Sequence, residues 1–81
     1  MPIMRATLTV DQELELRAWL TSGRAIGIRK DAGLSRSSVA RDLNVAESAL
    51  WRWEHGHRIP RGLHAAAYYR LLNKLARVPA A

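Results

Sequence analysis

The chain has 81 residues, the size of one small domain, and its 13 lysines and arginines outnumber seven aspartates and glutamates. The formal net charge of +6 indicates a polyanionic partner, either nucleic acid or an anionic membrane. The chain contains no cysteine, which excludes disulfides, thiolate zinc sites and thiol nucleophiles.

The charge is unevenly distributed along the chain. Residues 1–23 carry two basic and three acidic side chains, so the positive excess lies in residues 24–81. We expect the polyanion to meet that part of the chain. No apolar stretch approaches the roughly 20 residues that span a bilayer, and the N-terminus lacks the pattern of a signal peptide. These features predict a cytoplasmic protein with no membrane partner.

Apolar residues recur at intervals of three and four, without the alternation of β-strands, and this pattern predicts an all-α single domain over residues 1–81. A first helix is expected to begin after Thr9, whose hydroxyl and Gln12 are spaced as a capping box, and to end at Gly23. Its inner face should draw on Leu14, Leu16, Ala18, Trp19 and Leu20. A second helix is expected over about residues 24–32, closed by a left-handed glycine at position 33.

Three further helices complete the expected five. Ser35 should cap a third helix that runs to Leu43, after which Asn44 turns the chain through positive φ. The fourth helix is expected over about residues 46–55 and the fifth over about residues 62–77, ended by Pro79. Residues 1–6 and 78–81 are expected to be frayed.

Two short helices joined by a three-residue turn, over about residues 35–55, are typical of a helix-turn-helix, whose second helix enters the major groove of DNA. Ala40 is small where the two helices would cross. Leu50 and Trp53 are spaced to point inward, and Asn44 tolerates the left-handed conformation that the turn requires.

Residues 28–60 carry apolar and turn-forming residues at a fixed spacing: Ile28-Arg29, Gly33-Leu34-Ser35, Val39-Ala40, Leu43-Asn44-Val45, Leu50, Trp53-Glu54-His55-Gly56, Arg58 and Pro60. This set resembles the Cro and CI (XRE-like) family of helix-turn-helix phage repressors, and the resemblance extends over residues 24–77. It implies a lambda-repressor-like fold of five helices, operator DNA as ligand and a role in transcription. It also implies a buried ion pair between Arg29 and Glu54.

The sequence departs from this family at two positions. Ala46 stands where a serine or threonine usually caps the recognition helix, so about 1 kcal/mol of capping is missing or is supplied otherwise. Arg36 stands where the family favours glutamine. We therefore assign Arg36 to a contact with a DNA phosphate, together with Ser37, in preference to glutamine's bridge to a recognition side chain.

Helical periodicity leaves the outer face of the recognition helix to Glu47, Ser48, Trp51 and Arg52, which are the candidate base readers. Arg52 can bind guanine through O6 and N7, and Ser48 can serve either base edge. Glu47 can accept from cytosine N4 or can simply stabilise the helix dipole. Trp51 can contact a thymine methyl group or sugar, or pack against a partner. The alternative for Arg52 is a phosphate contact without base choice.

A basic, glycine-containing segment follows the recognition helix. It holds His55, His57, Arg58 and Arg61, which are the candidate phosphate contacts. The alternative is an ordinary solvated loop.

Other chemistries fit the sequence poorly. No cysteine or paired carboxylate completes a metal site around His55, His57 and His64, and no nucleophile has a base at readable spacing, so we expect no metal, no cofactor, no small-molecule ligand and no enzymatic activity. The fifth helix carries more apolar side chain than a domain of this size is expected to bury, which predicts a homodimer on DNA through Tyr69, Leu71 or Leu75.

The sequence as a whole therefore predicts a sequence-specific double-stranded DNA-binding regulator, a Cro-like repressor that occludes its operator on the nucleoid of a bacterial or phage-infected cell. The alternative is an antitoxin, or a phage packaging or assembly module, that uses the same fold mainly to bind a protein.

Overall fold

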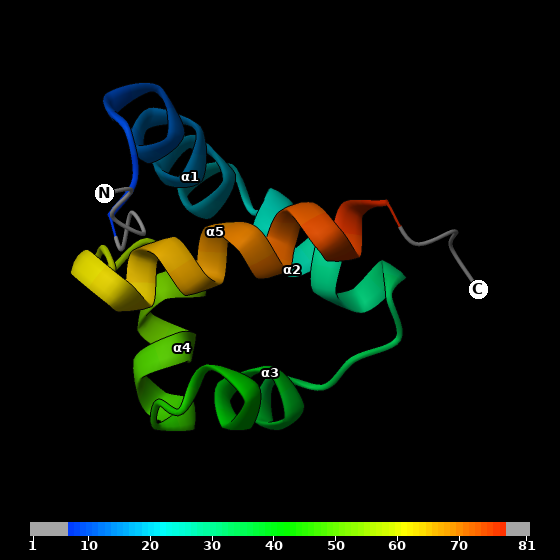
Figure 1. The fold of residues 1–81 in the computed structure, drawn as a ribbon. Coiled ribbons are helices and arrows are strands. Elements are labelled where there is room, and N and C mark those ends of the chain that lie inside the picture. Colours follow the sequence, from blue (N-terminus) through cyan, green and yellow to red (C-terminus); the bar gives the residue numbers. More distant parts are fainter. Residues whose placement is uncertain (1–6, 78–81) are drawn as a thin grey trace, which may run out of the picture.

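The computed structural model describes residues 7–77, which form five α-helices and, over that range, no strand (Figure 1). The helices are α1 (Val10–Ser22), α2 (Arg24–Asp31), α3 (Arg36–Leu43), α4 (Glu47–Glu54) and α5 (Gly62–Ala76). The predicted all-α, five-helix fold is confirmed. Among these helices none is long and apolar enough to cross a membrane. The expected fraying of residues 1–6 and 78–81, and the end of the last helix at Pro79, lie outside the described residues.

The core forms around α5, which lies between α1 on one side and the α3–α4 pair on the other (Figure 1). Tyr68 and Leu72 of α5 are almost completely buried. Ala65 of α5 joins them, and every other helix contributes two or more side chains: Leu16, Leu20, Ala25, Ile28, Val39, Ala40, Leu43, Leu50 and Trp53. Each short helix is therefore held by tertiary packing, because eight residues are too few to be stable alone.

Local capping fixes where α1 and α3 begin, and a left-handed glycine separates α1 from α2. The Thr9 hydroxyl accepts from the Gln12 amide at 3.2 Å while the Gln12 side chain accepts from the Thr9 amide at 2.9 Å, which is the predicted capping box. Gly23, at φ 83°, ends α1 and begins α2. The Ser35 hydroxyl accepts from the Ser38 amide at 3.1 Å. These predicted boundaries are confirmed.

Three helices end in the same way, with a left-handed residue after the last turn. Gly33, Asn44 and Gly56 have φ values of 77°, 58° and 71°. The next residue in each case donates its amide to the carbonyl five residues earlier, at 3.1, 3.0 and 2.8 Å. This is the Schellman arrangement, which satisfies carbonyls that the helix leaves free and turns the chain sharply. Asparagine serves at the second of these positions because its short polar side chain tolerates positive φ.

The structure shows which of the apolar side chains of α1 and α5 face the core. Leu14 points outward with 57% of its surface exposed, and Ala18 is also exposed, because α1 turns its Leu16 and Leu20 side to the core. Leu71 and Leu75 of α5, two of the residues proposed to join a second copy, are partly buried against the core. Tyr69 is covered by α1, where its ring stacks on Trp19 with centroids 5.5 Å apart.

Tyr68 is almost completely buried, and this burial raises the pKa of its hydroxyl well above the ordinary value of 10.0. The nearby Glu54 carboxylate raises it further, and the Arg29 guanidinium partly offsets the effect. The native state therefore keeps this proton at a pH where the unfolded chain has lost it. Since the unfolded state is the one that deprotonates, stability falls as pH rises above about 10.

We predict that the free energy of unfolding of the wild-type protein falls between pH 10 and 11 by about 1 kcal/mol more than that of Tyr68→Phe. Urea denaturation at several pH values measures both curves, and Tyr69 titrates in both proteins, so its contribution cancels in the comparison. Parallel curves across this interval would contradict the prediction.

Candidate nucleic-acid interface

The α3 and α4 helices form one unit, joined by the three residues 44–46. Ala40 and Leu43 of α3 are buried beside Leu50 and Trp53 of α4, so the inner faces of the two helices share the core. Ala46 precedes α4 in an extended conformation and provides no side-chain cap, as expected. The orientation of α4 therefore depends on packing and on the ion pairs described next, and not on a capping hydroxyl.

A buried ion pair joins α2 to α4. Arg29 donates from Nε to Glu54 Oε2 at 2.6 Å and from Nη2 to Glu54 Oε1 at 3.2 Å. Its Nη1 donates to the Leu34 carbonyl at 3.0 Å, in the turn after α2. Arg29 is 7% exposed and Glu54 is 2% exposed, so both charges are compensated within the core. The pair that the family resemblance implies is present.

Arg36 extends this pair to the surface. Its Nε donates to Glu54 Oε1 at 3.1 Å, and its Nη1 lies 3.7 Å from Glu47 Oε2. Arg36 therefore bridges α3 to the first turn of α4, so a contact with a recognition residue is present at this position although arginine stands in place of glutamine. The arginine replaces glutamine's hydrogen bond with an ion pair. The DNA-phosphate contact assigned to Arg36 stays a prediction for the part of the guanidinium that these carboxylates leave free.

The outer face of α4 is exposed as helical periodicity predicts. Glu47, Ser48, Trp51 and Arg52 are all accessible, whereas Leu50 on the opposite side is fully buried. Glu47 is tied to Arg36, while Arg52 makes no ion pair within residues 7–77. The four candidate base readers thus share one helix surface.

Trp51 lies in an aromatic cluster that we define as the Trp51 cluster: Trp51, His55 and His57. The His55 imidazole stacks on the indole with centroids 4.1 Å apart and planes 22° apart, and His55 Nδ1 lies 2.8 Å from the Trp51 carbonyl oxygen. The His57 ring is tilted against the same indole at 5.3 Å. His57 follows the left-handed Gly56, so the turn directs it back over the last turn of α4. We had not predicted this cluster, although the spacing of Trp51 and His55 by four residues is its sequence signal.

The segment after α4 brings its basic side chains together. An open hollow of about 570 Å³, which we call the basic hollow, is lined by Trp53, Gly56, His57, Arg58, Ile59, Pro60, Arg61 and His64. Arg58, Arg61 and His57 thus border one concave surface that adjoins the end of α4. His55 is exposed directly after the last residue of α4, and Ser37 is exposed in the first turn of α3. The geometry groups the predicted phosphate contacts in this segment on a surface next to the outer face of α4.

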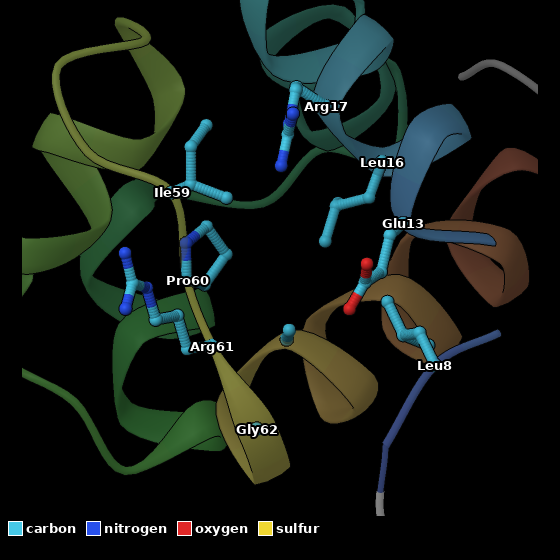
Figure 2. Close-up of a pocket in the computed structure, with 9 residues that line it drawn as sticks. Leu8, Glu13, Leu16, Arg17, Ile59, Pro60, Arg61 and Gly62 are labelled. Carbon is cyan, nitrogen blue, oxygen red and sulfur yellow. The ribbon is translucent and has the colours of Figure 1, made fainter. Parts of the chain in front are cut away.

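A second cavity, of about 360 Å³, lies on the α1 side of the same segment (Figure 2). Leu8, Leu16, Ile59 and Pro60 give it apolar walls. Glu13 and Arg17 of α1 extend into it, whereas the Arg61 guanidinium points to the other side of the segment (Figure 2). Arg61 therefore presents its charge on the side of the basic hollow.

The three histidines are divided between two tryptophans. His55 and His57 contact Trp51, and His64 lies against Trp53 with ring centroids 6.2 Å apart. Over residues 7–77 no three histidine or acidic side chains gather in a way that would hold a metal ion. Each of these imidazoles instead has an aromatic neighbour.

Comparisons with known protein families, with curated proteins and with solved structures find no match to this chain. The resemblance to helix-turn-helix repressors therefore rests on the sequence pattern, and the interface is argued from its own geometry.

We predict that Glu54→Ala lowers the free energy of unfolding by about 3–5 kcal/mol, because it leaves the buried Arg29 charge without its main partner. A double-mutant cycle with Arg29→Ala, measured by urea denaturation, should show strong coupling between the two residues. Glu47→Ala is the matched control, since its pair with Arg36 is solvent-exposed and should contribute under about 1 kcal/mol. Coupling near zero between positions 29 and 54 would defeat the prediction.

Proposed function

We propose that this chain is a sequence-specific double-stranded DNA-binding regulator of transcription, acting as a Cro-like repressor that occludes its operator in the cytoplasm of a bacterial or phage-infected cell. The observation that carries the proposal is the exposed outer face of α4, bordered by the basic hollow and held from behind by the buried Arg29–Glu54 pair. A rigid helix with polar side chains on its free face, beside clustered cations, is suited to entering the major groove.

The proposed roles of the α4 side chains follow from their chemistry. Arg52 has two parallel donors for guanine O6 and N7. Ser48, one turn earlier, can donate or accept. Glu47 accepts from cytosine N4, and its ion pair with Arg36 reduces the repulsion that a free carboxylate would meet near phosphates. These residues read bases in the proposed complex.

The surrounding cations hold the duplex. Arg58 and Arg61 border the basic hollow, and neither forms an ion pair with another residue of the described chain. His57 and His55 lie between them and α4, and Ser37 is exposed in the first turn of α3. Contacts of this kind fix position and orientation without reading sequence, and they depend strongly on salt.

Self-association on DNA stays part of the proposal in a weaker form. Tyr69, Leu71 and Leu75 retain only part of their surface for a second copy, because α1 and the core cover the rest. A dimer through the C-terminal helix would place two α4 helices on half-sites about 34 Å apart and favour inverted repeats. A monomer would favour an asymmetric site.

A second candidate function has one observation in its favour. Val10, Leu14 and Leu63 are exposed by 71%, 57% and 69%, and none of them belongs to the α4 face or the basic hollow. Exposed apolar side chains outside the DNA face suit a protein partner, as in an antitoxin or a packaging or assembly module.

Selection from a random pool of duplexes by the purified chain tests the proposal. We expect a defined sequence to be enriched, with symmetry that reports the number of copies bound. Footprinting on the enriched duplex then locates the site. Retention of all sequences alike, at every salt concentration at which binding occurs, would exclude sequence-specific recognition and favour the second candidate.

We predict that replacing a base-contacting residue and replacing a phosphate-contacting residue have different effects on binding. Arg52→Ala should cost about 1–3 kcal/mol of binding free energy on the selected duplex and little on a scrambled one, because a lost guanine contact removes discrimination at one base pair. Arg58→Ala and Arg61→Ala, the matched controls, should weaken both duplexes alike and reduce the salt slope by about one counterion each.

Fluorescence anisotropy titrations at several salt concentrations provide these comparisons. An equal loss on both duplexes for Arg52→Ala would assign that side chain to a phosphate. The base-reading role would then fall to Glu47, Ser48 and Trp51.

A further inference from the structure

Trp51 differs from the other exposed side chains of α4 because it is large, apolar and immobilised. It is 40% exposed, yet the imidazole of His55 covers it at 4.1 Å and the ring of His57 leans on it at 5.3 Å. His55 is itself fixed, since its Nδ1 lies 2.8 Å from the Trp51 carbonyl oxygen. Trp51 thus presents a rigid apolar surface on the face of α4 that carries Ser48 and Arg52.

The following inference rests on the proposed function, because it takes the outer face of α4 as the DNA-reading surface. Base edges in the major groove offer hydrogen-bond donors and acceptors at every base pair, and one large apolar group, the C5-methyl of thymine. The part of the indole beside a base edge would bury polar atoms without a partner if it met guanine, cytosine or adenine there. A methyl group is the partner that costs no hydrogen bond.

We infer that Trp51 is a specificity-determining residue that packs its indole against the C5-methyl group of a thymine in the operator. His55 and His57 are positioning residues for this contact. They hold the indole in one rotamer, so the side chain loses little freedom when the methyl group is buried against it. The thymine lies beside the base pair read by Ser48 or Arg52, which occupy neighbouring positions on the same helix surface.

The geometry disfavours stacking of a flipped or single-stranded base on Trp51. Such stacking needs a free aromatic face, and the His55 ring lies nearly parallel to the indole and covers one of its faces. The tilted His57 ring occupies further indole surface. What stays accessible suits a compact group such as a methyl more than an extended ring.

The test replaces each thymine of the selected duplex, one at a time, by deoxyuridine, which removes the methyl group and keeps all hydrogen-bonding atoms. We expect one thymine, or one in each half-site, at which the replacement weakens wild-type binding about fourfold, the equivalent of ~0.8 kcal/mol for one buried methyl group. Trp51→Gln should bind the thymine and deoxyuridine duplexes equally at that position. Trp51→Ala is the second variant, and near-wild-type melting temperatures verify that both fold.

The role of His55 is tested by the ratio of the affinities for the thymine duplex and the deoxyuridine duplex. His55→Ala should reduce the discrimination between thymine and deoxyuridine, whereas His55→Phe, which keeps an aromatic ring on the indole, should retain it. A role of His55 in phosphate binding alone would lower the affinity for both duplexes and leave the ratio unchanged.

The outcomes separate this inference from the proposed function. If no duplex sequence is selected, the proposed function fails. If a duplex is selected but no deoxyuridine replacement weakens binding, or if Trp51→Gln keeps the wild-type ratio, the proposed function stands and the role of Trp51 as a methyl reader is overturned.

Discussion

The arrangement of the helices depends on one buried carboxylate. Glu54 ends α4 inside the core, where an uncompensated charge would be very costly, and it is tolerated because Arg29 meets it with two hydrogen bonds and Arg36 adds a third. Those contacts draw on α2, α3 and α4 together. They fix the rotation of α4 about its axis, since any other rotation would remove Glu54 from both guanidinium groups. The need to pair the Glu54 carboxylate on the inner face of α4 therefore determines which side chains lie on its outer face.

The same ion pair also involves the turn after α2, and the turn after α4 follows directly from it. Arg29 also donates to the Leu34 carbonyl, in the turn that Gly33 begins, so the path from α2 to α3 is tied to the ion pair. After α4, Gly56 reverses the chain and directs His57 back onto Trp51. The basic hollow follows within a few residues. Left-handed Gly33, after α2, thus lies next to the residue that Arg29 binds, and left-handed Gly56, after α4, leads from Glu54 to the surface proposed for DNA.

Local rules predicted the helices and their ends, because a capping hydroxyl or a left-handed residue acts within a few positions of the chain. Thr9, Ser35 and Asn44 needed no tertiary information. The Arg36 bridge and the Trp51 cluster were not predicted, since a side chain's choice between a phosphate, a carboxylate or a neighbouring ring depends on rotamers and on helices packed against it. The exposure of Leu14 was not predicted for a related reason. Periodicity shows which side chains share one side of a helix, but the helices packed against it decide which side is buried.

The chain of charges would also allow side chains at the proposed DNA surface to change partners while the core stays intact. Arg36 shares its guanidinium between buried Glu54 and exposed Glu47. A base edge that draws Glu47 away breaks only its solvent-exposed contact with Arg36, which is worth little because water replaces it, whereas a phosphate that draws Arg36 away also removes one of the three hydrogen bonds to Glu54. Glu54 still keeps its two hydrogen bonds from Arg29, so its charge stays compensated. The stable Arg29–Glu54 pair lies inside the core, and the weaker Arg36–Glu47 pair lies at the surface. Glu47, at the start of α4, can therefore change partners while the rotation of the helix stays fixed.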